Sequence, residues 1–217
     1  MKRPNITLKL ATSLDGKIAL ANGQSEWITG EKSREAGRRL RGEHDAIAIG
    51  SNTAVLDNPQ LTTRISGAPN PIRVVFDTHL RLSPKSNLAQ STKLAPVWLF
   101  CQSKESERAE ILSYLGVKLF PVAYDNGLDI QNALKILFQN NVHSLLIEGG
   151  GTLAASFIKL DVIDNIEWFR APVILGGDGR NAIGDLGLES LNLVHKFNRV
   201  SVFEIGEDIY EKYERVK

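Results

Sequence analysis

Four polar residues that could move protons stand singly beside short apolar runs. They are Lys9, Asp15, Asp57 and Glu148. In a cleft, a lysine can donate a proton or orient a hydroxyl group, and a carboxylate can act as an acid or a base. Lys9 could equally be the solvent-facing residue of a strand, and Asp57 could simply cap a turn. These residue types allow acid–base chemistry without deciding it.

A run of three glycines follows Glu148 and separates an apolar run from a segment with helical spacing. Glycines let a backbone approach phosphate oxygens closely, and a following helix N-terminus offers unpaired N–H groups. The loop lacks the Gly-x-Gly-x-x-Gly spacing of a Rossmann unit and comes late in the chain. It could bind a dinucleotide phosphate, or it could be a tight strand-to-helix turn with Thr152 as a plain N-cap.

Arginines gather in the first third of the chain. Arg41 ends an expected helix and Arg64 lies in a polar loop, and both could bind a phosphate through their planar guanidinium forks. Taken alone, each could also be structural. A solvated helix face accounts for Arg34, Arg38 and Arg39.

Trp27 stands in a polar loop bounded by glycine, SEWITG, which is an unusual setting for a core residue. The indole could form an aromatic wall against a flat ligand ring. It could also seal the core beneath the loop. The pattern does not separate the two.

Several classes of protein are excluded or disfavoured by composition. With 26 basic and 25 acidic residues the net charge is +1, which gives no footprint for nucleic acid or a membrane surface. The single cysteine, Cys101, rules out an internal disulfide, and its apolar surroundings indicate a buried strand residue. No metal site is expected, since none of four histidines is paired at ligand spacing: His44, His79, His143 and His195.

No apolar run is long enough for a signal peptide or a membrane span. A lone cysteine also fits a reducing compartment. We therefore expect a cytoplasmic protein. Motifs of nucleophile elbows, Walker A loops and zinc deaminases are missing as well.

The elements that must position these residues alternate between strand and helix and then become β-rich. Continuous apolar runs predict buried strands, and 3.6-residue spacing predicts helices. Thr29 is a candidate N-cap for a helix reaching about Arg41. We expect strands at residues 6–11, 45–50, 72–76, 97–101, 117–122, 145–147, 166–169, 173–175, 200–205 and 209–213, with helices at 105–115 and 130–138 and one ending near Lys159. The last two strands flank a hairpin signal, and one α/β domain is predicted over residues 1–217.

Taken together, the motifs resemble the reductase domain of the bifunctional riboflavin-pathway deaminase–reductases. The resemblance covers about residues 4–184 in one order, and it is carried by KLATSLDGKIA (9–19), SEWITG (25–30), Arg41, DAI (45–47), GSNT (50–53), DNPQLTTR (57–64), PIRVVFD (71–77), EGGGTLA (148–154) and APVILGG (171–177). It implies a dihydrofolate-reductase-like fold with a central mixed sheet flanked by helices, usually as a homodimer. It also implies NADPH as cofactor and hydride transfer to C1′ of the ribosyl group of 5-amino-6-(5-phosphoribosylamino)uracil.

The resemblance assigns roles residue by residue. Substrate binding falls to Ser25, Arg41, Leu61, Arg64 and Glu148, with the two arginines nearest the phosphate. The NADPH site is lined by Ala11, Trp27, Thr53, Asp57 and Thr78, the last placed to bond the adenosine 2′-phosphate. The pyrophosphate is cradled by Gly150, Gly151, Thr152, Leu153, Ala154, Ala155 and Ser156. Proton handling and sugar orientation are assigned to Lys9, Asp57 and Glu148. The glycine loop and the two arginines are expected to line a single cleft.

Alternatives remain open. The family's bifunctional members carry a deaminase domain before the reductase, and this sequence starts at the reductase. Either a separate deaminase acts in the same pathway, or the sequence is an excised domain, or the chain is a paralogue with another substrate. The motifs also fit the related reductase of the 2,5-diamino pyrimidinone. Two further possibilities are a reductase of a pterin-type heterocycle and a non-catalytic NADPH-binding protein.

Overall fold

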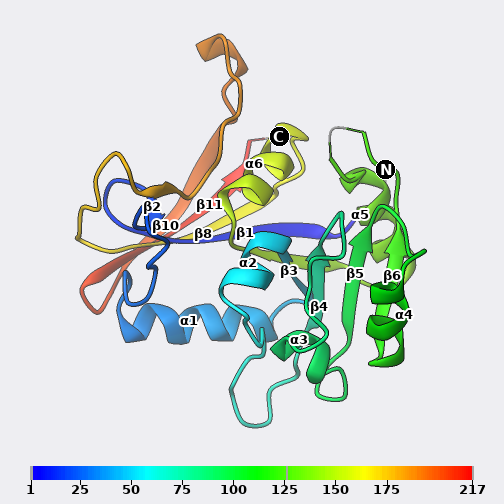
Figure 1. The fold of residues 1–217 in the computed structure, drawn as a ribbon. Helices are drawn as coiled ribbons and strands as arrows, with labels where there is room; N and C mark the ends of the chain where they lie inside the picture. The colour runs from blue at the N-terminus through cyan, green and yellow to red at the C-terminus, as the bar shows by residue number, and fades with distance from the viewer. Residues whose placement is uncertain (1, 126, 217) are drawn as a thin grey trace. The chain divides into compact units, whose positions relative to one another are not determined.

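The computed structural model describes residues 2–125 and 127–216, which form two compact units (Figure 1). Unit 1 contains Arg38–Leu146 and the residues up to Asn5, and unit 2 contains Ile6–Gly37 with the chain from Ile147 onward. Each unit is therefore built from two separated segments. The single domain expected over residues 1–217 stays a prediction.

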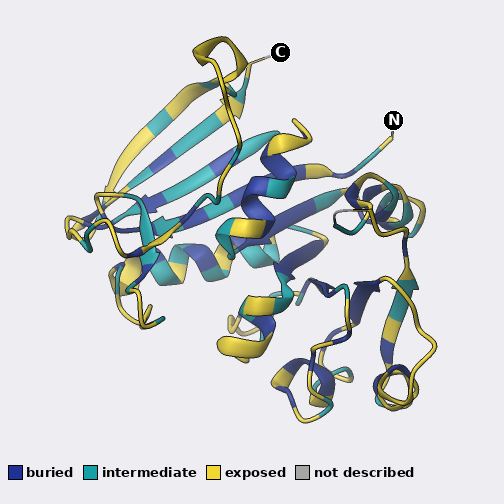
Figure 2. Cartoon of the chain, turned by 45° about the horizontal axis from the view of Figure 1, so that its top comes forward, coloured by how far each residue is buried: buried dark blue, intermediate teal, exposed yellow. Residues whose placement is uncertain are grey.

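Unit 1 is built on parallel strands, as their sequences predict. The strand order is β3 (Ala46–Gly50), β4 (Ile72–Phe76), β5 (Val97–Cys101) and β6 (Val117–Pro121). Between them run α2 (Ser51–Leu56), α3 (Asn87–Gln90) and α4 (Glu107–Tyr114), and α5 (Ile130–Gln139) follows β6. Strands β3 to β5 are almost entirely buried, as Figure 2 shows, because helices and loops cover both faces of a parallel sheet.

Side chains that accept hydrogen bonds from the backbone set the starts of the helices in unit 1. Ser106 Oγ accepts from the Ala109 amide, and Asp129 Oδ1 accepts from the Asn132 amide. Helix α4 therefore begins at Glu107, two residues later than its apolar pattern indicates. Cys101 is fully buried, as predicted, and burial raises the pKa of its thiol to about 11. It is therefore not an activated nucleophile.

Unit 2 contains a four-stranded part of the sheet with mixed strand directions. Its order is β10 (Phe197–Ile205), β11 (Asp208–Arg215), β8 (Asn165–Arg170) and β1 (Asn5–Thr12). Strands β1 and β8 are parallel, whereas β8, β11 and β10 pair antiparallel. The β10–β11 hairpin turns at Gly206, whose φ is 72°, and it confirms the predicted C-terminal hairpin.

The remaining elements of unit 2 are short. Helix α6 (Gly151–Lys159) follows the glycine run, and a small antiparallel pair joins β2 (Lys17–Ala19) to β9 (Arg180–Asn181). A 3₁₀ turn spans Leu191–Leu193. Helix α1 (Glu31–Gly42) and strand β7 (Ser144–Glu148) each contain residues of both units. The predicted mixed α/β architecture, with a central mixed sheet flanked by helices, is confirmed.

Two sequence predictions in unit 2 are wrong. Residues 173–175 form no strand, because Asp15 accepts hydrogen bonds from the amides of Leu175 and Gly176 and so removes donors that a strand would need. Thr29 is not the N-cap of α1. The helix begins at Glu31, and the amide of Gly30 donates to Asp208.

Across the described residues, no helix combines the length and the apolar character that a membrane crossing requires.

Candidate functional site

Strand β1 presents Lys9 and Ala11 on the same face of the sheet, because side chains alternate along a strand. In the register with β8, Lys9 stands opposite Glu167 and Ala11 opposite Phe169. Lys9 is half-buried, and a Cβ on Gly37 would lie 3.3 Å from its Cε. Lys9 therefore passes close to α1 where that helix carries no side chain, and it is not an ordinary solvent-facing strand residue.

A polar cluster surrounds the register partner of Lys9. Glu167 accepts a hydrogen bond of 2.5 Å from the Tyr210 hydroxyl, and its other oxygen lies 3.4 Å from Lys212 Nζ. The Glu167 side chain is only 13% exposed. The hydroxyl of Tyr210 and the ammonium group of Lys212 thus fix the Glu167 carboxylate in place.

The glycine loop requires its glycines for backbone reasons. Gly149 and Gly150 have φ values of 91° and 84°, in the region that side chains disfavour. A Cβ on Gly151 would lie 2.5 Å from the carbonyl oxygen of Asn181, so no side chain fits there. Glu148, only 9% exposed, ends β7 directly before this loop.

The N-terminus of α6 has no side-chain cap. Gly150 is its N-cap residue and makes no capping bond, so the reading of Thr152 as N-cap is wrong. Thr152 lies inside the first turn, where its carbonyl accepts from Ser156 Oγ at 3.0 Å. Leu153, Ala154 and Ala155 are buried. Of these three, Leu153 could offer a phosphate its backbone N–H group, whereas the Ala154 amide already donates to the Gly150 carbonyl at 3.0 Å within the helix.

The loop of residues 25–30 exposes its tryptophan. Trp27 is 70% exposed and has a φ of 69°, so it does not seal the core. The Arg34 guanidinium carbon lies 4.3 Å from the centre of the indole. Arg34 is itself fixed by Glu31 and by the carbonyl of Thr29, at 2.6 Å. The indole is stacked against a cation and still largely exposed, a setting in which it can contact a flat ring.

Asp208, at the start of β11, anchors the end of the loop that carries Ser25 and Trp27. Its Oδ2 accepts from the Gly30 amide at 2.7 Å and from Ser33 Oγ at 2.5 Å, and the residue is 3% exposed. The carboxylate also lies at the positive end of α1, which favours a negative charge. Sequence reasoning missed this residue, which is far away in the chain. Ser25 is exposed.

The hydrogen bonds of Asp15 give this residue a structural role. It accepts from Ser13 Oγ at 2.6 Å and from the amides of Leu175 and Gly176. These bonds, chiefly the one from Ser13, lower the pKa of its carboxyl from 3.8 to about 2. The ionised form therefore stabilises the folded state above about pH 4, and this contribution is lost as the pH falls toward 2.

We expect Asp15→Asn to lower the free energy of unfolding at neutral pH, because the amide accepts hydrogen bonds without a charge. The difference from the unsubstituted protein should narrow as the pH falls from about 4 to 2. Urea unfolding at several pH values measures it. A difference that stayed constant across this range would contradict the assignment.

In unit 1, residues 57–64 form a strained loop. Asn58, Leu61 and Arg64 all have positive φ, at 41°, 56° and 52°. Such conformations cost free energy in residues other than glycine and persist only where surrounding contacts impose them. Strain of this kind is typical of ligand-binding segments, and this loop contains the predicted substrate residues Leu61 and Arg64.

Side chains outside the loop impose its shape. Arg41 Nη1 donates to the Thr62 carbonyl at 3.0 Å, and the side-chain amide of Asn87 donates to the Asn58 carbonyl at 2.7 Å. The Thr63 amide donates to Asn70 Oδ1 at 3.1 Å. Leu61 is buried and Arg64 is exposed. Arg41 therefore has a structural role whether or not it also binds a phosphate.

Arg73 of β4 holds the same loop from within the core. It is fully buried, and its Nη1 donates to the Gln60 carbonyl at 3.2 Å and to Ser91 Oγ at 2.6 Å. Its Nη2 donates to the carbonyls of Ser91, at 2.7 Å, and Ala95. Burial lowers the pKa of the guanidinium to about 10, so it is still charged at neutral pH. Sequence reasoning assigned it no role.

The three cofactor residues predicted in unit 1 follow two neighbouring parallel strands. The Asp57 amide donates to the Thr53 carbonyl at 3.0 Å, so these residues are one helical turn apart at the end of α2. Thr78 follows β4, and its carbonyl accepts from the Gln102 amide at 3.1 Å. Because β3 and β4 are parallel and paired, α2 and Thr78 follow strand ends at the same edge.

The structure thus groups the predicted site residues into two sets. Unit 2 contains Lys9, Ala11, Ser25, Trp27, Glu148, Gly150, Gly151, Thr152, Leu153, Ala154, Ala155 and Ser156. Unit 1 contains Arg41, Thr53, Asp57, Leu61, Arg64 and Thr78. Their functional roles, and the single cleft, stay predictions. Within residues 2–125 and 127–216, no three His, Cys, Asp or Glu side chains cluster as metal ligands do.

A strand that leads through an uncapped glycine loop into a helix is an arrangement with which α/β proteins can bind phosphate groups. The family model of the RibD C-terminal domain matches residues 4–210, and the chain belongs to this family.

Relatives agree with this membership. The riboflavin biosynthesis protein RibD of Aquifex aeolicus is 37% identical over 215 residues, which is 99% of this chain and 58% of that protein. The 2,5-diamino-6-ribosylamino-4(3H)-pyrimidinone 5′-phosphate reductase of Methanothermobacter thermautotrophicus is 32% identical, over 97% of this chain and 98% of that protein. A crystal structure of a diaminohydroxyphosphoribosylaminopyrimidine deaminase/5-amino-6-(5-phosphoribosylamino)uracil reductase from Thermotoga maritima matches with a TM-score of 0.83 and 31% identity, over 99% of this chain and 57% of that one. The chain thus spans little more than half of the RibD protein and of the Thermotoga structure.

Proposed function

We propose that this chain is an NADPH-dependent reductase of riboflavin biosynthesis. It reduces the ribosyl group of 5-amino-6-(5-phosphoribosylamino)uracil to the ribityl chain by hydride transfer to C1′. The observation that carries the reductase assignment is the similarity along 97% of this chain to a protein named as a 2,5-diamino-6-ribosylamino-4(3H)-pyrimidinone 5′-phosphate reductase, of which it covers 98%. The uracil substrate is taken from the name of the Thermotoga structure. The reductase activity in that name needs no segment outside the matched length.

The residues present fit a dinucleotide. The glycine loop leaves the N-terminus of α6 without a side-chain cap, and the exposed indole of Trp27 can lie against a flat ring. When bound, NADPH would supply the hydride. Gly150 to Ser156 would line its pyrophosphate, with the backbone N–H groups of the first turn up to Leu153 donating to it. Ala11, Thr53, Asp57 and Thr78 would line the rest of the NADPH site.

The same proposal assigns the substrate to the strained loop and its neighbours. Arg64 and Arg41 would bind the phosphate, since guanidinium groups match its geometry and stay charged. Ser25, Leu61 and Glu148 would position the remainder.

Proton handling falls to Lys9 and Glu148, with Asp57 as a third candidate. Lys9 is half-buried and stands opposite Glu167 in the strand register, a setting that supports an ammonium group that orients a sugar hydroxyl or donates a proton. Glu148 is nearly buried at a strand end. Asp57 is exposed at the C-cap of α2, which makes it the least supported of the three.

One experiment tests the function and separates it from the second candidate. The loss of NADPH absorbance is followed with 5-amino-6-(5-phosphoribosylamino)uracil and with the 2,5-diamino pyrimidinone phosphate side by side. The name of the Methanothermobacter relative favours the second compound, and that of the Thermotoga structure favours the first. If the protein reduces neither compound, the remaining candidates are a reductase of a pterin-type heterocycle and a non-catalytic NADPH-binding protein.

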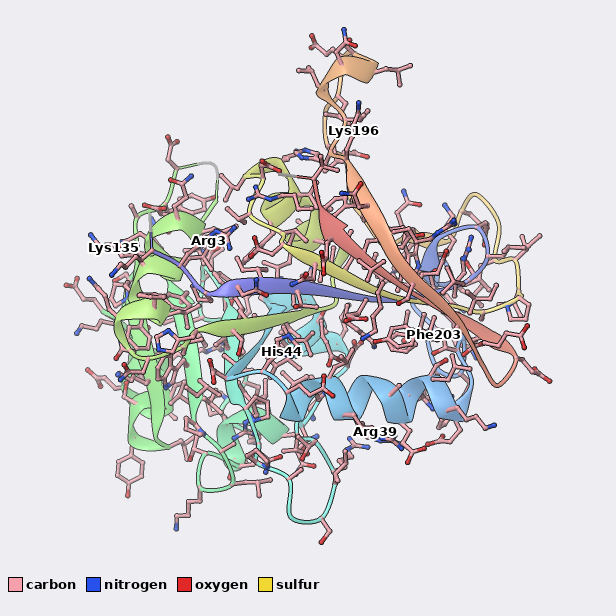
Figure 3. All side chains as sticks on the ribbon, turned by 180° about the vertical axis from the view of Figure 1, so that it is seen from behind. Arg3, Arg39, His44, Lys135, Lys196 and Phe203 are labelled. Atoms are coloured by element: carbon pink, nitrogen blue, oxygen red, sulfur yellow. The ribbon has the colours of Figure 1, made fainter. Side chains whose placement is uncertain are left out.

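Arg64→Ala is expected to raise the substrate KM by about 30-fold, because a charge-assisted phosphate contact contributes about 2 kcal/mol. NADPH affinity should change less than about twofold. Steady-state kinetics and NADPH titration measure the two quantities, and Arg39→Ala, an exposed residue labelled on α1 in Figure 3, serves as the control. An unchanged KM would count against a phosphate role for Arg64.

A homodimer is also proposed. Strand β10 lies at the edge of the sheet and exposes Val200, Val202 and Phe203, the last labelled in Figure 3. An apolar edge strand is a surface that proteins usually cover. Sedimentation equilibrium measures the assembly. A cytoplasmic location and a separate deaminase in the same pathway complete the proposal.

A further inference from the structure

Two arginines approach the turn that follows β4. Arg81 lies in this turn, and its Nη1 donates to Asn52 Oδ1 at 2.6 Å, in the first turn of α2. Arg108, on α4, donates from Nη1 to the carbonyl of Leu80 at 3.2 Å. Both guanidinium groups are thus fixed near Thr78, at the carboxyl ends of parallel strands, where α/β proteins bind nucleotides.

Neither arginine is neutralised. In the part of the chain that the structure describes, Arg81 and Arg108 bond only to an amide oxygen and a backbone carbonyl. By contrast, Arg170 and Arg215 each pair with a carboxylate, at 2.9 and 3.0 Å. Two uncompensated positive charges beside one turn attract an anion.

The carboxylate of the same turn is not exposed where an anion would bind. Asp77 is fully buried, and its Oδ2 accepts from the Leu82 amide at 2.8 Å. It therefore shapes the turn from inside. The next residue is Thr78, a neutral side chain that would not repel a phosphate.

We propose that Arg81, with Arg108 as the second cation, binds the adenosine 2′-phosphate and makes this chain prefer NADPH to NADH. The inference rests on the proposed function, and it deepens that function by naming the residues that select the cofactor. The 2′-phosphate is the one group that distinguishes the two cofactors. A guanidinium fork that already has one neutral anchor can bind it with little loss of side-chain entropy.

The test compares paired ligands on Arg81→Met, Arg108→Met and Arg81→Lys. Affinities for NADPH, NADH, 2′,5′-ADP and 5′-AMP are measured by calorimetry. Arg81→Met should weaken NADPH and 2′,5′-ADP by about 30-fold and leave NADH and 5′-AMP within about twofold, as expected for the loss of one charge-assisted contact. Arg108→Met should act in the same sense with a smaller effect, and Arg81→Lys should lie between. Arg39→Met is the matched control. Arg81 is exposed, so thermal unfolding should be unchanged.

The outcomes separate this inference from the function on which it rests. If the protein binds NADPH but reduces neither pyrimidine, the proposed reductase function is refuted. The comparison of NADPH with NADH on the arginine variants can still be made. Equal weakening of NADPH and NADH by Arg81→Met, or weakening of neither, overturns the inference while the reductase stands. Preference of the unsubstituted protein for NADH or 5′-AMP overturns it as well.

Discussion

Arg73→Met is expected to lower the free energy of unfolding by about 3 kcal/mol, since it leaves several buried acceptors without donors. The acceptors are the carbonyls of Gln60, Ser91 and Ala95. Methionine fills much of the volume and donates nothing. Because Gln60 belongs to the strained loop, the substrate KM should rise as well. Urea unfolding measures the first effect, and steady-state kinetics the second.

Arg73→Lys distinguishes charge from geometry. An ammonium group can reach one or two of the acceptors and cannot reproduce the fork, so its loss of stability should be smaller but still clear. Arg39→Met, at an exposed site on α1, controls for the loss of a charge and should change stability by less than about 0.5 kcal/mol. If Arg73→Met were as stable as this control, the buried guanidinium would not be what holds the loop.

Gly151→Ala should abolish tight NADPH binding. The added Cβ would lie 2.5 Å from the carbonyl oxygen of Asn181 and 3.2 Å from the amide of Gly184, so the backbone at the start of α6 must move. A displacement of this kind should weaken NADPH by about 100-fold and destabilise the fold by about 2 kcal/mol. Calorimetric titration and thermal unfolding measure the two effects.

The matched control is Gly177→Ala. Gly177 has nothing within 4 Å of an added Cβ and is not among the residues of positive φ, so alanine should be accepted there. If both variants bound NADPH equally well, the glycine loop would not be the pyrophosphate site. If Gly151→Ala were destabilised but bound NADPH normally, its role would be confined to packing against residues 181–184.

The parts of the fold that are local in sequence could be predicted. Strands β4 and β5 occupy the predicted residues, since a continuous apolar run between turn signals has little choice but a buried strand. The helix after the glycine run was predicted from its helical spacing, and α6 ends at Lys159 as expected. The glycines themselves indicated the strand-to-helix turn, and the structure requires them there.

The failures come from partners far away in the chain. Residues 173–175 have the pattern of a strand, but Asp15, 160 positions before Leu175, accepts hydrogen bonds from the amides of Leu175 and Gly176 instead. The start of α1 is fixed by Asp208, 178 positions from Gly30. The buried role of Arg73 could not be predicted, because a charged residue within an apolar run is usually interpreted as a surface position. Trp27 is exposed and stacks on Arg34. The residue types of the loop could not indicate this contact.

The anchoring of Gly30 and Ser33 by Asp208 has a consequence for biosynthesis. Asp208 is translated 178 residues after Gly30. The helix that begins at Glu31 therefore lacks its natural acceptor until residue 208 has been made, and the loop around Trp27 is anchored only after the β10–β11 hairpin has paired with β8. Nascent chains halted before residue 208 would consequently carry most of the parallel strands and still be unable to organise this aromatic loop.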